Sequence, residues 1–548
     1  MLRSWAPALC LAIALSRSAA AQPTPQPRAA LAPPPPVEIV VEGTPRARSA
    51  SEARRERRVL ALAPHRTASE LLLTVPGVFV TQHSGEGKAH QIFFRGFDAV
   101  HGQDIELWVA GAPVNEVSNI HGQGYADLHF VMPEVVQAVR ARPGAFDPRQ
   151  GDFAIAGSMD FELGYEEPGI TAKASAGSFG ARRAFLAYRP PWASERPFAA
   201  VELYGSDGYG RARAADRATA LAQVEVPLGS GLNATLMAST YAARFGSAGV
   251  LRLDDLEAGR IGRFDSYDPE QGGSSQRTQL AARIRRVSDV TELELAPFFV
   301  RRALVLRSNF TGFLENATHG DSIQQQNTAT TLGARAHLKR SLSLVSEHDA
   351  MEAGVLLRSD FVQQSQRRIS TVDASVTGTE VDAEVHATNV GGYLDLDLYP
   401  LRRLALRGGL RADALGFMVT DRRPEALAGR SAHGRHVGAK GSAEVQLGGG
   451  LSATASFGQG FRSPQARSLG DGEQTPFTRS VSQELGVRLR SNAGLNLVVA
   501  GFRTTLSDDL VFDEATSRNE AVPGTLRVGC VADLVAEPIE WFSSALGF

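Results

Sequence analysis

Residues 92–104 read Ile-Phe-Phe-Arg-Gly-Phe-Asp-Ala-Val-His-Gly-Gln-Asp, and the interpretation of the whole chain starts from them. The apolar run Ile92-Phe93-Phe94 predicts a short strand, and Arg95 follows it directly. We therefore expect the Arg95 guanidinium to be drawn into an interior. A buried arginine has to be paired, because loss of its carboxylate partner costs roughly 3–5 kcal/mol.

Two later segments belong with this stretch: Asn-Ile-His-Gly-Gln-Gly-Tyr-Ala-Asp-Leu at 119–128 and Gly-Asp-Phe-Ala-Ile-Ala-Gly at 151–157. Together they resemble the plug domain of TonB-dependent outer-membrane receptors, whose Arg-Gly-Phe motif is Arg95-Gly96-Phe97 here. The resemblance implies an α+β plug over residues 44–165. It also implies an antiparallel, all-β transmembrane barrel over residues 166–548, with the plug inside its lumen.

The resemblance further implies ion pairs between plug and barrel, because plug arginines face barrel glutamates in this family. Arg95 is one such plug cation. Residues 140–145 read Arg-Ala-Arg-Pro-Gly-Ala where the family has an Arg-Gly-Pro site, which makes Arg142 a substitute cation. Glu484 is the candidate barrel partner.

The N-terminus has the features of an export signal. Arg3 supplies a positive charge, residues 5–15 are apolar, and Ala19-Ala20-Ala21 is a small-residue cleavage site, so residues 1–21 are interpreted as a signal peptide. Residues 22–36 are Pro-rich and include four consecutive prolines, which predicts an extended periplasmic linker.

Residues 37–43 form a short β-prone run that ends at a glycine and resembles the TonB box. An extended segment behind a flexible linker can add as a strand to the sheet edge of a partner. An ordinary β-prone tether is the alternative that so short a run leaves open. The resemblance assigns TonB binding to Glu38, Ile39, Val40, Val41 and Glu42.

From about residue 169 onward the sequence alternates with a period of two. Residues 394–399 read Leu-Asp-Leu-Asp-Leu-Tyr, and residues 332–339 read Leu-Gly-Ala-Arg-Ala-His-Leu-Lys. One strand face is therefore aliphatic and the other charged. This pattern fits a soluble sandwich as well as an outer-membrane barrel with lipid outside and a polar lumen inside.

The lengths of the connections favour the barrel. After the signal peptide no run of about 18 apolar residues occurs, so a membrane could be crossed only by a closed barrel. Short turns at one end and long loops at the other are typical of outer-membrane barrels. Short links occur at 229–231, 448–450 and 491–494, and long polar segments at 244–275, 363–380, 420–434 and 461–478.

The number of strands conflicts with the resemblance. We find roughly 17 candidate strands, whereas the resemblance implies about 22 and bacterial barrels have even numbers. About 380 residues after the plug are too few for the larger barrel with loops of this length. We therefore expect a barrel that lacks its last strands, although the terminal Phe548 could also end a finished one.

The polar, Gly-rich segments of the plug are candidates for ligand contact. By resemblance the plug apices face the outside solvent, and the two His-Gly-Gln triplets at 101–103 and 121–123 lie in them. These histidines could contact a metal or substrate, or they could shape exposed turns. The candidate ligand residues are Ser84, Glu86, Lys88, Asp98, His101, Gln103, Asn119 and His121.

Several functions are disfavoured by composition. No Gly-x-Ser-x-Gly elbow, HExxH or phosphate loop is present, so no catalytic residues, cofactor or resident metal are expected. A net charge of −2 gives no reason to expect nucleic acid as a partner. Cys530 is the only cysteine after the signal peptide, which excludes an internal disulfide.

The resemblance implies active import of a scarce nutrient, most often a ferric siderophore, across the outer membrane of a Gram-negative cell. The implied partners are TonB with its inner-membrane complex, outer-membrane lipid, the barrel-assembly machinery and a small-molecule or metal-chelate ligand, with the receptor as a monomer. The alternatives are a passive porin or adhesin, a secreted soluble β-protein, and a truncated receptor without function.

Overall fold

The computed structural model describes residues 47–82, 87–193, 196–309, 311–313, 316–423, 429–464, 477–513, 518–539 and 541–548. The predicted signal peptide, periplasmic linker and TonB box lie outside these residues, as do Ser84 and Glu86. No helix in the described part is both long and apolar enough to cross a membrane.

The plug is an α+β domain that contains a five-stranded and a three-stranded sheet. The larger sheet has the order β1-β7-β8-β5-β6, in which β5 and β8 run parallel, and the smaller has the order β2-β3-β4. The elements are β1 (Ala53–Glu56), α1 (Arg57–Leu60), η1 (Ala68–Thr74), β2 (Val78–Thr81), β3 (Gln91–Phe94), β4 (Phe97–Asp98), β5 (Ile105–Val109), β6 (Ala112–Pro113), η2 (Pro133–Val135), β7 (Val136–Pro143) and β8 (Gly157–Leu163).

The plug has its own apolar core. In β3, Ile92 and Phe94 are 1% and 0% exposed, whereas Gln91 and Phe93 are half-buried. This difference arises because successive side chains of a strand point to opposite faces. The core continues through β5, β7 and β8, so the plug folds around its own interior as well as packing against the barrel.

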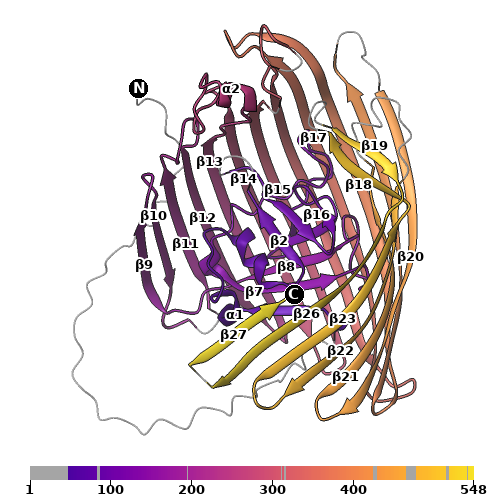
Figure 1. The fold of residues 1–548 in the computed structure, drawn as a ribbon. Helices are drawn as coiled ribbons and strands as arrows, with labels where there is room; N and C mark the ends of the chain where they lie inside the picture. Colours follow the sequence, from indigo (N-terminus) through magenta and orange to yellow (C-terminus); the bar gives the residue numbers. More distant parts are fainter. Residues whose placement is uncertain are drawn as a thin grey trace, which may run out of the picture. The chain divides into compact units, whose positions relative to one another are not determined.

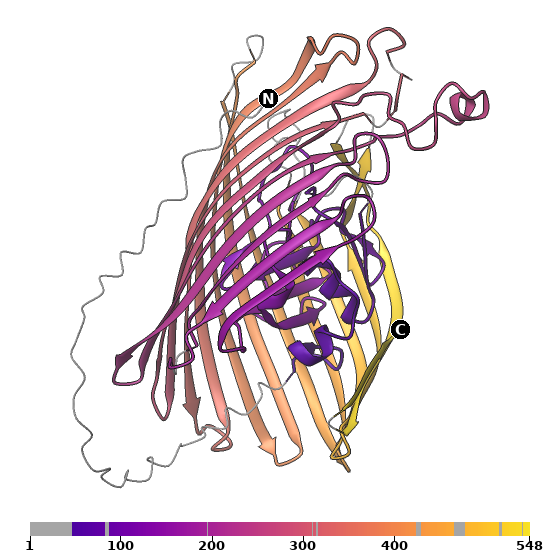
Figure 2. The ribbon, with the colours of Figure 1, turned by 90° about the vertical axis from the view of Figure 1, so that its left-hand side faces the viewer.

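The barrel of the described residues is closed and has the strand order β10 through β23, then β26, β27 and β9. Figures 1 and 2 show the plug inside this ring of strands. A separate hairpin, β24 (Asp508–Asp513) with β25 (Arg518–Pro523), lies between β23 and β26 in the sequence. The wall strands are β9 (Gly169–Ala176), β10 (Arg182–Arg189), β11 (Phe198–Ser206), β12 (Ala215–Gly229), β13 (Leu232–Gly246), β14 (Gly272–Val287), β15 (Thr291–Ser308), β16 (Ser322–Leu342), β17 (Asp349–Ile369), β18 (Val376–Leu401), β19 (Leu404–Asp421), β20 (Gly429–Gly448), β21 (Leu451–Arg462), β22 (Thr478–Ser491), β23 (Leu495–Leu506), β26 (Leu526–Ile539) and β27 (Phe542–Gly547).

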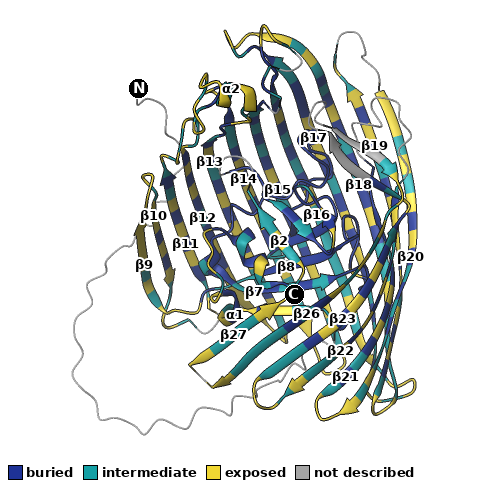
Figure 3. Ribbon diagram, viewed as in Figure 1, coloured by how far each residue is buried: buried dark blue, intermediate teal, exposed yellow. Residues whose placement is uncertain are grey.

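The wall has one polar and one apolar face. Asp395 is 4% exposed and its neighbour Leu394 is 51% exposed, and the same contrast holds between Glu484 at 4% and Leu485 at 68%. Figure 3 shows the alternation as buried and exposed bands along the strands. Charged side chains therefore point at the plug, while aliphatic ones form the outer surface expected to contact lipid. The predicted antiparallel barrel with a plug in its lumen is confirmed.

Short and long connections lie at opposite ends of the strands. The turn between β12 and β13 is tight, and Gly229, Ser230 and Gly231 all adopt positive φ in it. Residues 247–271 at the other end include α2 (Leu253–Glu257), which lies at the top of Figure 1.

Two loop predictions are wrong. Most of 363–380 continues β17 and β18, with only 370–375 between them, and 420–421 and 429–434 belong to β19 and β20. The polar residues of both segments extend these strands, because backbone pairing requires no apolar side chain.

Candidate functional site

The contacts between plug and barrel begin with Arg95. This residue follows β3 in a left-handed conformation with φ of 51°, and it is 7% exposed. Its Nη2 donates to Oε2 of Glu484 in β22 at 2.8 Å, and its guanidinium lies 4.6 Å from the ring centre of Phe502. The structure thus brings together the two residues that the sequence singled out.

Glu484 also holds the start of the plug. The backbone N–H of Ser51 donates to Glu484 Oε1 at 3.0 Å, and the Ser51 hydroxyl donates to Oε2 at 2.6 Å. One buried barrel carboxylate therefore accepts hydrogen bonds from two plug segments. Such charge-assisted bonds are about twice as strong as neutral ones.

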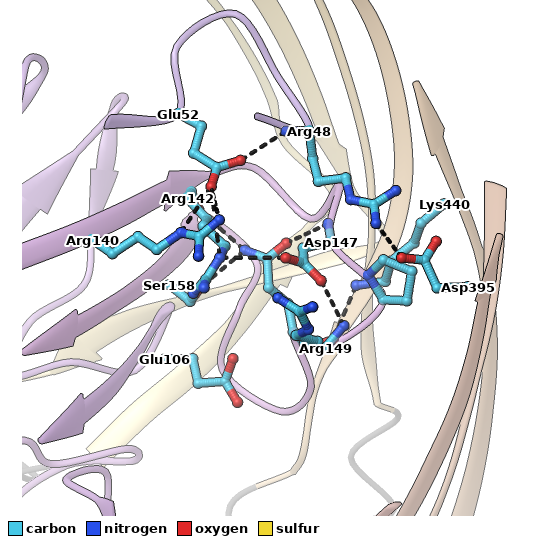
Figure 4. A network of polar contacts seen from close by, with 12 residues as sticks. Arg48, Glu52, Glu106, Arg140, Arg142, Asp147, Arg149, Ser158, Asp395 and Lys440 are labelled. Carbon is cyan, nitrogen blue, oxygen red and sulfur yellow. Dashed lines mark hydrogen bonds and ion pairs between the residues drawn. The ribbon is translucent and has the colours of Figure 1, made fainter. Parts of the chain in front are cut away.

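A second set of contacts lies between the plug and strands β17 and β18, as Figure 4 shows in part. Arg48 pairs with Asp395 and lies 2.8 Å from Asp397 Oδ1, both in β18. Arg149 Nε donates to Glu352 Oε1 in β17 at 2.7 Å. Because both cations come from the plug and the carboxylates from the wall, these pairs hold the plug in position.

The prediction that Arg142 pairs with the barrel is wrong. Its Nε lies 3.3 Å from Asp147 Oδ2 and 3.9 Å from Glu52 Oε1, and both carboxylates belong to the plug. The reason is its place in the sheet, since β7 pairs with β8 and Arg142 lies opposite Ser158. After β7 the chain turns toward the wall, so Arg149 makes the barrel contact instead.

Two plug carboxylates in this network are held ionised by their neighbours. Burial alone would raise the pKa of Glu52, but Arg140 and Arg142 outweigh it and the pKa lies below its usual value. Burial also opposes ionisation of Asp147, yet Arg149, Arg142 and Arg48 hold its pKa well below normal. Four arginines thus surround the carboxylates of Glu52 and Asp147. These interactions stabilise the conformation that this part of the plug adopts here.

Other plug-to-wall pairs had no signal in the sequence. Arg462 at the end of β21 is 0% exposed and pairs with Asp104, whose pKa is raised because burial outweighs that pairing. Arg55 Nη2 lies 2.6 Å from Asp533 Oδ1 in β26. Charged residues alternate with apolar ones along most barrel strands, so a period of two cannot identify which of them meets the plug. Further pairs include Glu134 with Arg183, and Glu116 and Asp127 with Arg302.

The candidate ligand residues of the plug are mostly covered. The exposed fractions are 1% for Lys88, 2% for His101, 0% for Gln103, 8% for Asn119 and 1% for His121, whereas Asp98 is exposed. The expectation of solvent-facing apices is therefore wrong for five of the described candidates. Barrel side chains lie against these segments: Gln325 contacts His121, and Gln364 accepts from Ser118 at 3.1 Å.

Two of these residues come into direct contact. Nε2 of His101 lies 3.2 Å from Nε2 of His121, and the Tyr125 ring centre lies 5.5 and 6.0 Å from the two imidazole centres. A second group with metal-binding side chains, Glu292, Glu294 and His337, lies on β15 and β16. Arg285 already donates to Glu292 at 2.8 Å in that group.

The fold and these contacts define a class of protein. It is a β-barrel whose lumen is filled by a domain with its own apolar core, and buried ion pairs hold that domain to the wall. Residues 45–158 match the family model described as TonB-dependent Receptor Plug Domain, and residues 208–528 match TonB dependent receptor-like, beta-barrel. The chain belongs to the TonB-dependent receptors, a family of outer-membrane proteins.

Solved structures share this fold at low identity. The ferric citrate transporter FecA in its unliganded form is 14% identical, with 88% of this chain and 74% of that chain covered at a TM-score of 0.72. The ferric yersiniabactin uptake receptor FyuA from Yersinia pestis is 15% identical, with 91% and 79% covered at 0.71. The copper transporter OprC is 16% identical, with 91% and 80% covered at 0.68. Identities this low establish the fold alone.

Proposed function

We propose that this receptor imports a ferric siderophore or a related metal chelate across the outer membrane of a Gram-negative cell, with energy supplied through TonB. Residues 1–21 would direct export, residues 22–36 would form the periplasmic linker, and residues 37–43 would bind TonB. The observation that carries the proposal is the plug itself, which fills the lumen and is bound to the wall by buried charges.

Passage through such a barrel requires the plug to move or to rearrange. Leaving one partner of a buried ion pair unpaired costs roughly 3–5 kcal/mol, so thermal motion would seldom open several pairs together. The outer membrane is too leaky to hold an ion gradient. The energy would therefore come from the inner-membrane complex, through TonB pairing with residues 38–42 as an added strand.

The plug contacts nearest to the predicted TonB box indicate where a pull would act first. Arg48, Ser51 and Arg55 follow the box within about fifteen residues. They contact Asp395, Glu484 and Asp533, which lie on three different wall strands. A pull on residues 38–42 would load these contacts before it reached the core of the plug.

A bound ligand can promote this step only through differential affinity. It has to bind the receptor with a released box more tightly than the receptor with a docked box. The covered apex segments around His101, Gln103 and Asn119 are the proposed place for such sensing, because they contact both the plug core and the wall.

Deletion of residues 37–42 tests the proposal. We expect the deletion to abolish energised uptake of the metal chelate while leaving binding to whole cells unchanged, since the barrel and the apices are intact. Growth under iron, zinc, copper and cobalamin limitation would identify the cargo. A matched control deletes residues 27–32, which shortens the linker equally and keeps the box.

Normal uptake by the box deletion would contradict the proposal and favour a passive porin. Retained cell binding without uptake in the wild type would favour an adhesin. If the protein were not found in the outer membrane as a barrel that resists heat unfolding, a receptor without function would be favoured.

We further propose a monomer that is inserted among outer-membrane lipids by the barrel-assembly machinery. Migration in mild detergent before and after heating tests this insertion.

A further inference from the structure

The barrel wall carries an apolar groove of about 520 Å³ that crosses four neighbouring strands, β12 to β15. This volume lies within the range of roughly 300–1,000 Å³ that is typical of ligand pockets. All of the described residues that line the groove are apolar. A ligand held there would therefore have to present an apolar part to the wall.

The groove opens on the face of the wall that points away from the plug. Leu236 at its edge is 46% exposed, whereas the next residue, Met237, is 4% exposed. On β15 the Phe298 side chain faces the plug, where its ring centre lies 6.0 Å from that of Trp108. Because successive side chains of a strand point to opposite faces, Phe299 points outward. The groove thus lies on the surface expected to contact lipid.

The hollow arises from the sizes of the outward side chains. Ala222 and Ala238 lie opposite each other on β12 and β13, next to the larger pair Leu280 and Phe299 on β14 and β15. Pro297 has no N–H to donate, and the ladder between β14 and β15 is interrupted at this residue. The row nearer to the short turns reverses the order of large and small side chains, with Val224, Leu236, Ala282 and Pro297.

An arginine lies at the edge of the groove that is nearer to the long loops. Arg301 is two residues beyond Phe299 on the same face of β15, and Thr278 of β14 and Thr330 of β16 lie opposite it. Opposite side chains of neighbouring strands have Cβ atoms about 4.5–5.5 Å apart. Arg301 is exposed and forms no ion pair with any residue in the described part of the chain. A cation and two hydroxyl groups therefore adjoin the apolar groove.

The position of Arg301 along its strand places it where the hydrocarbon of the membrane ends. Arg301 is the eleventh residue of β15, counted from Thr291 beside the short connection 288–290. About 9–11 residues of a tilted strand cross the hydrocarbon core, and the short turns of such barrels face the periplasm. Arg301 therefore lies at the outer boundary of the hydrocarbon, and the groove reaches down from it among the acyl chains.

We propose that this groove binds one phosphorylated acyl lipid of the outer leaflet, with an acyl chain in the groove and a phosphate on Arg301. A guanidinium can donate two parallel hydrogen bonds to a phosphate, and the Thr278 and Thr330 hydroxyl groups can donate to its other oxygens. The outer leaflet of a Gram-negative outer membrane consists of a glycolipid with several acyl chains and phosphate groups. Both parts of the ligand are thus present beside the wall. The site requires a barrel inserted in this membrane, and it depends on neither import nor TonB.

Native mass spectrometry of the purified full-length receptor in mild detergent tests the site. The receptor is stripped of lipid and then titrated with lipid A and with dephosphorylated lipid A. We expect one lipid A to bind in preference, and Arg301→Gln to weaken its binding roughly 10- to 100-fold, the loss expected for a hydrogen bond to a charged group. Ala238→Phe should also weaken it, because the added ring would fill the groove.

Arg435→Gln is the matched control. Arg435 of β20 is exposed on the outer face of the wall, since the adjacent His436 is 8% exposed, and it does not line the groove. This variant should bind lipid A as the wild type does. Heat-dependent migration shows whether each variant remains a folded barrel, so that lost binding is not lost folding.

Equal binding of the phosphorylated and dephosphorylated lipids would overturn the site, because ordinary contact with acyl chains would then explain it. Unchanged affinity for lipid A in the folded Arg301→Gln and Ala238→Phe variants would overturn it as well. Receptor dimers that carry no lipid and dissociate in the Ala238→Phe variant would instead assign the groove to a contact between two copies of the chain.

Discussion

At the scale of single residues, the plug is held by arginine–carboxylate pairs, with the arginine on the plug in some pairs and on the wall in others. Arg95 and Glu484 show what a resemblance can indicate, since the sequence singled out both residues and the structure places them 2.8 Å apart. Arg142 shows where the resemblance misled, because the predicted pairing of this residue with the barrel is wrong. It lies three residues beyond Val139 in the same strand, and its partners Asp147 and Glu52 come from the plug.

His90 should make the receptor sensitive to acid. Burial, with His129 beside it, lowers the pKa of His90 from 6.5 to about 3. The unfolded chain therefore binds a proton below about pH 6.5 that the folded chain does not bind until about pH 3, and stability declines as the pH falls through this window. Replacing His90 with Gln should reduce this decline by a few kcal/mol.

Unfolding in denaturant at pH 7 and at pH 4 measures this effect. His65→Gln is the control, because His65 is exposed. An equal acid-induced loss of stability in the His90→Gln variant and in the wild type would contradict the prediction.

At the scale of elements, β1 shows how alternation divides roles between adjacent residues. The Arg55 side chain points toward the barrel wall, is 3% exposed and pairs with Asp533 of β26. Arg54 points the other way and forms exposed pairs with Glu56 and Glu162. Arg55 therefore connects the start of the plug to the wall, whereas Arg54 contacts only other residues of the plug.

Arg55→Ala should therefore lower the force needed to pull the plug from a reconstituted receptor held at residues 38–42. The reason is that a buried pair contributes far more than an exposed one when a single partner is lost, roughly 3–5 against 0–1 kcal/mol. Arg54→Ala is the matched control and should leave the force almost unchanged. Equal effects of the two substitutions, measured by single-molecule pulling, would refute the distinction.

At the scale of the whole described unit, the plug closes the lumen because its backbone packs directly against the wall. A Cβ added at Gly458 of β21 would lie 2.0 Å from the backbone oxygen of Ala145 in the plug. At Gly408 of β19 an added Cβ would meet nothing within 4 Å. The glycine at 458 thus permits a close approach that any side chain would prevent.

Gly458→Val should displace the plug and make the receptor leaky, while Gly408→Val should leave it closed. Ion conductance of the purified receptor in planar bilayers measures both, with the expected result a several-fold higher conductance for the Gly458 variant. Backbone displacement is expected because neither partner in this contact is a flexible side chain. Closed behaviour of both variants would show that the lumen is sealed elsewhere.

The sequence by itself determined two-faced strands joined by short turns and long loops, because these are local properties of the chain. The alternation fits a sandwich as well as a barrel, and the plug inside a barrel followed from the resemblance that residues 92–104 carry. Local patterns failed where backbone pairing continues without apolar side chains, as at residues 363–380, which extend β17 and β18.

Only the tertiary structure decided which charges meet and which histidines approach each other. His101 and His121 are twenty residues apart, and Arg462 lies 358 residues from Asp104. Such contacts depend on closure of the barrel around the plug and on the path of the chain after β7. A period of two records which face a side chain occupies, but it holds no information about what lies opposite that face.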